Sequence, residues 1–167
     1  MNYSKALNEC IESAYMVAGH FGARYLESWH LLIAMSNHSY SVAGATLNDY
    51  PYEMDRLEEV ALELTETDYS QDETFTELPF SHRLQVLFDE AEYVASVVHA
   101  KVLGTEHVLY AILHDGNALA TRILERAGFS YEDKKDQVKI AALRRNLEER
   151  AGWTREDLKA LRQRHRT

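Results

Sequence analysis

An internal repeat constrains this chain more than any other feature of its sequence. Residues 4–35 align with residues 81–112 without a gap, so that Ser4 corresponds to Ser81 and the offset stays constant. The apolar positions that coincide are Leu7/Leu84, Cys10/Leu87, Ile11/Phe88, Ala14/Ala91, Val17/Val94, Ala18/Ala95 and Phe21/Val98. Their spacing places them on one face of an α-helix in each copy. A fixed period of this kind predicts one helical unit used twice, with each copy covering the apolar face of the other.

The composition favours a mainly helical domain. A chain of 167 residues with 46% hydrophobic content can bury a core as one domain, and its two prolines and seven glycines leave few turns for a many-stranded protein. Cys10 is the single cysteine and lies on the predicted apolar face, so we expect a reducing compartment. No apolar run reaches the length of a membrane span, and the first residues lack the apolar stretch of a secretion signal. We therefore expect a soluble, cytoplasmic protein.

Charge is distributed unevenly along the sequence. Residues 1–133 carry 7 Lys and Arg against 22 Asp and Glu, a net charge of −15, whereas residues 134–167 carry 11 against 5, a net charge of +6. The acidic part should repel nucleic acids and anionic membranes and favour a basic protein or peptide partner. A nucleic-acid role stays open for the basic residues 134–167. Beside a strongly acidic domain, however, we favour a connection between this segment and an acidic neighbouring region.

The first copy is expected to contain four helices, and the second copy repeats them. In the first copy they span residues 4–21, 29–35, 41–47 and 52–64, and Ser28 is the expected N-cap of the second helix. In the second copy the expected N-caps are Ser81, Thr105 and Ser130, the last for a helix that carries Val138, Ile140, Leu143 and Leu147.

These elements give a domain organisation. Repeat one is predicted over residues 1–64, an acidic linker over 65–80 and repeat two over 81–147. Residues 148–167 then form a basic helical extension with Thr154 as N-cap. Because this extension has only two leucines, we interpret it as the start of a further region rather than a domain of its own.

The segment that opens the second short helix has a distinctive sequence. It reads Gly104-Thr105-Glu106-His107 followed by Val-Leu-Tyr-Ala-Ile-Leu, and its counterpart in the first copy is Glu27-Ser28-Trp29-His30. Together with the duplicated helices and the acidic linker, this segment resembles the double Clp N-terminal repeat, the domain at the front of Clp/Hsp100 AAA+ unfoldases. The resemblance covers about residues 1–147 and is nearest to the ClpC branch. It implies an all-α fold of two pseudo-twofold related four-helix repeats.

The resemblance also implies a function and a set of site residues. Such domains dock adaptors of the MecA type and protein substrates for a hexameric ATP-driven ring that feeds a Clp peptidase. ClpC-type domains can also bind phosphoarginine through the glutamate of each Gly-Thr-Glu-His segment, near a hydroxyl residue that begins the long helix. Carried over by position, the contact residues are Glu106, Thr105 and Ser4 on one face, with Trp29 and Ser81 on the equivalent face. Trp29 cannot form a bidentate ionic contact with a guanidinium, although it can stack on one.

Each of these residues also has an ordinary structural interpretation. Glu106 is an acid in the first turn of a helix, where the helix dipole favours it. Trp29 is expected to be partly exposed, either as an interface anchor or folded back on its own repeat. His30 and His107 have no second ligand at helical spacing, so a structural hydrogen bond is the better interpretation of both than a metal site.

Nothing in the sequence indicates catalysis. It contains neither a Gly-x-x-x-x-Gly-Lys phosphate loop nor a Gly-x-Ser-x-Gly nucleophile motif, and Cys10 is placed as a core residue. We therefore expect no enzyme activity, cofactor or metal for this chain, the ATPase lying in the rest of the presumed parent protein. The alternative to a docking domain is a free-standing helical adaptor or regulator.

Overall fold

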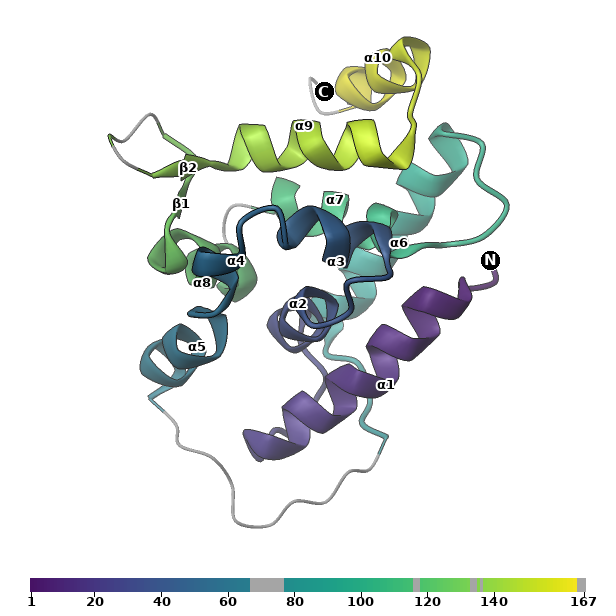
Figure 1. The fold of residues 1–167 in the computed structure, drawn as a ribbon. Coiled ribbons are helices and arrows are strands. Elements are labelled where there is room, and N and C mark those ends of the chain that lie inside the picture. The colour runs from purple at the N-terminus through teal and green to yellow at the C-terminus, as the bar shows by residue number, and fades with distance from the viewer. Residues whose placement is uncertain (67–76, 116–117, 133–134, 136, 165–167) are drawn as a thin grey trace.

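The computed structural model describes residues 1–66, 77–115, 118–132, 135 and 137–164, and these residues are mostly helical (Figure 1). Repeat one contains α1 (Lys5–His20), α2 (Ser28–Ser36), α3 (Val42–Leu47), α4 (Pro51–Met54) and α5 (Leu57–Thr65). Repeat two contains α6 (His82–Val97), α7 (Thr105–His114), α8 (Leu119–Ala127) and α9 (Ile140–Ala151), with the two-residue strands β1 (Phe129–Ser130) and β2 (Val138–Lys139) before α9. A final helix, α10 (Arg155–Arg164), follows. The all-α prediction is confirmed.

The two repeats exchange their third helices. In repeat one α3 packs against α7 and α9, and in repeat two α8 packs against α2 and α5. Helix α6 begins and ends at the positions that the repeat offset assigns to the ends of α1, and α7 and α8 begin where the same offset places the starts of α2 and α3. The structure therefore has the pseudo-twofold arrangement that the repeat predicts, with each copy covering the other.

Backbone hydrogen bonds reinforce this exchange. The N–H of Ser4 donates to the carbonyl of Leu103 over 2.8 Å, so the start of α1 is attached to the loop before α7. At the equivalent place, the N–H of Ser81 donates to the carbonyl of Leu26 over 3.0 Å and attaches the start of α6 to the loop before α2. Short parallel bridges pair Tyr3 with Leu103 and Phe80 with Leu26, which are again equivalent positions of the two repeats.

The long helices begin and end as the sequence predicts. The hydroxyl oxygens of Ser4 and Ser81 each accept a hydrogen bond over 3.1 Å from the backbone N–H three residues later, as N-caps do. The apolar face of both helices is buried, and Cys10 has no exposed surface. Burial raises the pKa of the Cys10 thiol to about 11, so this cysteine is a core residue rather than a nucleophile.

Several predicted boundaries were wrong. The fourth helix of repeat one is divided into α4 and α5. Helices α2 and α7 begin at Ser28 and Thr105, so the N-cap positions belong to the preceding Glu27 and Gly104. Ser130 does not cap a helix, because it pairs with Lys139 in a parallel β1–β2 ladder and its hydroxyl donates to the carbonyl of Glu132.

The C-terminal residues pack on repeat two instead of leaving it. The predicted boundary after residue 147 lies inside α9, and α10 packs against α6 with Leu161 only 1% exposed. The Trp153 ring is stacked on the His107 ring at a centroid distance of 6.0 Å. Thr154 caps α10 as predicted: its hydroxyl accepts the N–H of Asp157 over 3.1 Å, and the Asp157 carboxylate accepts the N–H of Thr154 over 2.9 Å.

Two further expectations concern the linker and the membrane. Most of the acidic linker, residues 67–76, lies outside the described residues. Among the helices of the described part, none is long and apolar enough to cross a membrane.

The pseudo-symmetry generates a prediction about stability. Both long helices are followed by a residue with left-handed backbone, Gly22 at φ 63° and His99 at φ 59°. A side chain in this conformation costs about 1 kcal/mol, and His99 is exposed, so His99→Gly should raise the free energy of unfolding by roughly 1 kcal/mol. Urea denaturation measures the change. His99→Ala keeps the strained conformation and is the control; the explanation fails if the alanine variant gains as much stability as the glycine variant.

Candidate partner-binding site

Two histidines shape the loops in which the predicted site residues lie. The N–H of Gly104 donates to Nδ1 of His107 over 2.8 Å, and the N–H of Glu27 donates to Nδ1 of His30 over 2.9 Å. Burial lowers the pKa of His30 to about 3 and also lowers that of His107, where the Glu106 charge opposes it. Both rings are therefore neutral hydrogen-bond acceptors that fix the loop. This arrangement agrees with the structural interpretation, and the described residues hold no group of three or more metal-ligating side chains.

Glu106 lies over the N-terminus of α7. Its Oε1 is 3.6 Å from Nε2 of His107, and its side chain is 23% exposed. Gly104 leaves the room that the carboxylate uses, because a Cβ at this position would collide with it. A partly exposed carboxylate beside a helix N-terminus can receive a guanidinium or an ammonium group from a partner.

Trp29, at the equivalent position of repeat one, is not partly exposed as expected. It is only 6% exposed, and its ring meets the Phe21 ring edge-on at a centroid distance of 4.8 Å. Nε2 of His30, the counterpart of the nitrogen beside Glu106, has no hydrogen-bond partner among the described residues. The position that holds a partly exposed carboxylate in repeat two is therefore part of the core in repeat one, because the large tryptophan ring gains more from burial than from water.

The hydroxyl residues among the predicted contacts already have structural partners. Thr105 is 1% exposed, and its Oγ1 accepts the N–H of Ala43 in α3 over 3.2 Å. Ser4 and Ser81 cap their own helices. The bridge to Leu103 brings Ser4 beside the loop before α7, whereas Ser81 lies beside the loop before α2. Of the five predicted residues, Glu106 alone carries a charged group, and this group is partly exposed.

A groove that the sequence analysis did not single out runs along α1. It has a volume of about 860 Å³ and lies between α1 and the segment of residues 77–80. Its lining residues are Tyr3, Asn8, Ile11, Glu12, Tyr15, Glu77, Leu78, Pro79 and Phe80. We call it the α1 groove. Aromatic rings form its inner end, where Tyr3 and Phe80 both pack against Phe88 at centroid distances of 5.7 and 5.0 Å.

Negative charge surrounds this groove. Burial and then the nearby charges of Glu92 and Asp89 raise the pKa of the Tyr3 hydroxyl. Burial and then Glu77 raise the pKa of the Tyr15 hydroxyl. An apolar, aromatic surface in a negative field suits a polypeptide segment that combines apolar and basic side chains.

The repeat offset could have signalled the groove. Tyr3 and Phe80 are equivalent positions, each just before a serine N-cap, and the pseudo-twofold exchange brings them to the same aromatic cluster. Both rings lie one position before the aligned ranges 4–35 and 81–112, so this equivalence falls outside the alignment.

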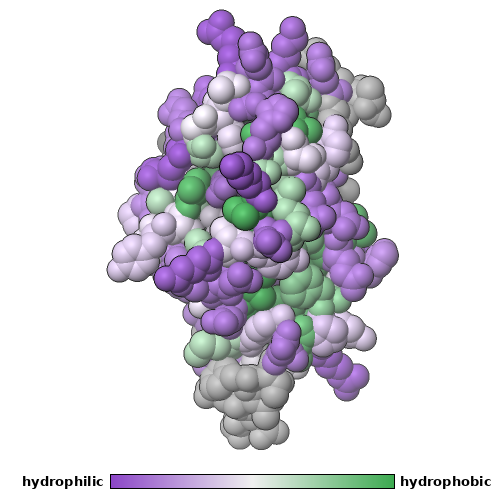
Figure 2. Space-filling view, turned by 90° about the vertical axis from the view of Figure 1, so that its right-hand side faces the viewer, coloured by the Kyte–Doolittle hydropathy of each residue, from purple (hydrophilic) through white to green (hydrophobic). Residues whose placement is uncertain are grey.

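Large apolar side chains are also exposed elsewhere on the described part of the molecule. On the face turned toward the viewer in Figure 2, apolar side chains appear as separate patches among hydrophilic ones. Tyr93 on α6 and Val102 in the following loop, 38% and 40% exposed, are examples of large apolar side chains at the surface. Scattered exposure of this kind is normal for a protein surface and needs no partner.

The role of Thr105 generates a prediction. Thr105→Val removes the acceptor of a buried backbone N–H without changing side-chain volume, so the free energy of unfolding should fall by about 1–3 kcal/mol. Thr46→Val is the matched control, because Thr46 is equally buried but its hydroxyl donates to the Val42 carbonyl of its own helix. Urea denaturation of both variants measures the difference. Equal losses would mean that the bond to Ala43 contributes nothing specific.

Comparison with known proteins identifies relatives of this arrangement. Comparison with curated protein sequences gives no significant match. Among solved structures, the fold is similar to the Hsp104 N-terminal domain from Candida albicans, with 17% identity, a TM-score of 0.68 and coverage of 94% of this chain and 96% of that one. It is also similar to the N-terminal domain of the caseinolytic protease associated chaperone ClpD from Arabidopsis thaliana, with 16% identity, a TM-score of 0.67 and coverage of 90% and 95%.

These structural likenesses concern the fold, and a sequence match supplies the family. The model of the Clp repeat (R) N-terminal domain family matches residues 2–127, three quarters of the chain. The matched range contains both copies of the long helix, both buried histidines and the crossed bridges between the repeats. This chain therefore belongs to the Clp repeat N-terminal domain family.

Proposed function

We propose that this domain docks protein substrates and adaptors for a Clp/Hsp100 unfoldase. The observation that carries the proposal is the α1 groove, an open, aromatic hollow with Glu12 and Glu77 at its edge. Family membership supports the same role. The proposed occupant is an unfolded or extended segment that places apolar side chains on the rings and basic side chains near the acids.

The proposal extends to the parent assembly. The chain acts as a non-enzymatic docking module, and the ATPase belongs to the presumed parent protein, which works as a hexamer with a Clp peptidase in the cytoplasm. Cys10 is buried and is the single cysteine of the sequence, which is compatible with such a reducing compartment. Within the family we place the chain nearest the ClpC branch with adaptors of the MecA type, on the resemblance of the Gly104-Thr105-Glu106-His107 segment.

Charge reversal tests the α1 groove. In the double variant Glu12→Lys/Glu77→Lys, affinity for a labelled unfolded peptide made of Arg, Lys and Leu should fall about tenfold, because two attractive charges become repulsive. Both side chains are exposed, so the fold should survive, and fluorescence anisotropy measures the affinity.

The matched control is Glu59→Lys/Glu125→Lys, which changes two exposed acids on α5 and α8 and alters the net charge by the same amount. Its affinity should stay within about twofold of the original chain. If both double variants lose affinity equally, net charge alone attracts the peptide and the groove is not the docking site.

Phosphoarginine recognition is proposed only for repeat two. Glu106 is the glutamate that remains, whereas the buried Trp29 offers repeat one no charged group. Glu106→Gln should weaken binding of free phosphoarginine at least about tenfold, because the guanidinium loses its carboxylate partner. Titration calorimetry should give one site per chain, with Glu125→Gln as the control. Unchanged affinity of the Glu106 variant, or two sites per chain, would contradict this assignment.

A further inference from the structure

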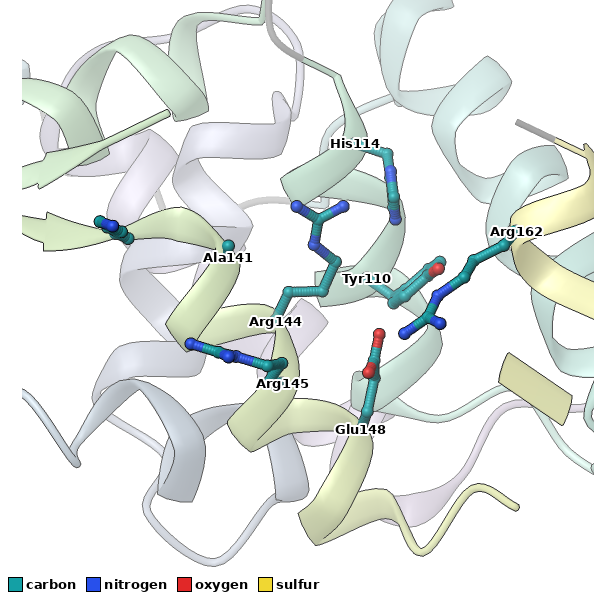
Figure 3. A pocket seen from close by; sticks show the side chains of 8 residues that line it. Tyr110, His114, Ala141, Arg144, Arg145, Glu148 and Arg162 are labelled. Carbon is teal, nitrogen blue, oxygen red and sulfur yellow. The ribbon is translucent and has the colours of Figure 1, made fainter. Parts of the chain in front are cut away.

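A second groove lies at the end of the molecule where α9 and α10 meet. Its first part, about 580 Å³, lies between α7, α9 and α10 and includes Tyr110, Arg144, Glu148 and Arg162 in its lining (Figure 3). Its second part, about 600 Å³, follows one stripe of α10 through Arg155, Leu158 and Lys159. Arg162 lines both parts, so they adjoin. We call the two together the α9–α10 groove.

Positive charge dominates this groove. Its cationic lining residues are Lys139, Arg144, Arg145, Arg155, Lys159 and Arg162, whereas Glu148 is its one carboxylate among the described residues. Five of these cations form no ion pair with a carboxylate of the described part, namely Arg144, Arg145, Arg155, Lys159 and Arg162. By contrast, Arg150, further along α9, has a partner, since its guanidinium bonds both carboxylate oxygens of Asp49 over 2.9 Å.

Glu148 lies at the centre of the first part. Its side chain and that of Arg162 point toward one another across the pocket, with Tyr110 beside them (Figure 3). Glu148 is 8% exposed, and burial raises the pKa of its carboxyl against the opposing charge of Arg162. No ion pair joins Glu148 to Arg144, Arg145 or Arg162 in the described part of the chain, although the charges of these arginines favour its ionised form. The hydrogen-bond donors of the three guanidinium groups therefore remain available to a ligand.

We propose that the α9–α10 groove binds an acidic polypeptide segment of a partner protein. Four of the five cations that lack an ion pair in the described part are arginines, whose planar forks bind carboxylates in a bidentate manner. Leu158, which is partly exposed, gives the groove apolar surface for the stem of a bound peptide's side chain. This inference stands apart from the α1 groove, because it concerns another surface and a partner of opposite charge.

A polypeptide fits the surroundings better than a nucleic acid. Residues 1–133 carry a net charge of −15, so a long polyanion that extended past the groove would meet repulsion from the rest of the domain. An acidic segment in a polypeptide can be short and flanked by neutral or basic residues. In Figure 2, hydrophilic side chains dominate the upper end of the molecule, where Figure 1 places α10.

The test measures binding of a fluorescein-labelled peptide of Glu, Asp and Gly to the whole chain by anisotropy. Arg155→Gln/Lys159→Gln removes two exposed charges of the groove that lie away from Glu148, so this variant should fold and bind about tenfold more weakly. Arg144→Gln/Arg162→Gln should weaken binding at least as much. The matched control, Arg122→Gln/Arg126→Gln, removes two exposed arginines from α8 and should bind within about twofold of the original chain.

The variant Glu148→Gln should change the affinity for the acidic peptide in the opposite direction from the arginine and lysine variants. Loss of its negative charge should tighten peptide binding a few-fold, which a purely structural residue would not do. The proposal is overturned if the original chain does not bind the peptide, if the groove variants bind as it does, or if the α8 control loses as much affinity. Tighter binding of oligo-dT than of a peptide of equal charge would replace the polypeptide with a nucleic acid.

Discussion

The crossed attachment between the two repeats is the constraint on which the rest of the structure depends. Each long helix begins at a serine cap whose backbone N–H bonds the loop before the second helix of the other copy, Ser4 to Leu103 and Ser81 to Leu26. The same crossing sends α3 onto α7 and α8 onto α2. Each long helix packs mainly on the second helix of its own copy, α1 on α2 and α6 on α7, and the core is completed where α3 and α8 cover the other copy.

The same backbone frame carries two different chemistries at equivalent places. In repeat two, Glu106 remains beside the His107 imidazole and partly exposed to water. In repeat one, Trp29 fills the equivalent position and packs against Phe21. The imidazole that holds the loop is kept in both copies because its Nδ1 accepts a backbone N–H that would otherwise be buried without a partner. The backbone of this loop therefore accepts either tryptophan or glutamate before the histidine, as long as the hydrogen bond from the loop N–H to the histidine Nδ1 is kept.

Features that depend on neighbouring residues could be predicted from the sequence, whereas features that depend on contacts between residues far apart in the sequence could not. The helical period, the Ser81 cap and the burial of Cys10 follow from neighbouring residues and are confirmed, whereas the predicted caps Ser28 and Ser130 were wrong. Thr105 looked available because its real partner, Ala43, is 62 residues away in the sequence. The α1 groove arises where the crossing brings Tyr3 and Phe80 together, and the β1–β2 ladder pairs only two residues on each side, too few to leave a pattern.

The crossed attachment also limits how such a domain can evolve. In this duplication each copy is hydrogen-bonded to the first residues of the other copy's long helix. Deletion of either copy would therefore expose apolar surface of the remaining copy and leave its loop amides without partners, so the two copies must be inherited together. Divergence is then confined to positions that face outward or that can be absorbed into the core, as at Trp29. The repeat gives the domain two equivalent positions, and the fold lets them differ at Trp29 and Glu106 while the loop hydrogen bonds stay the same.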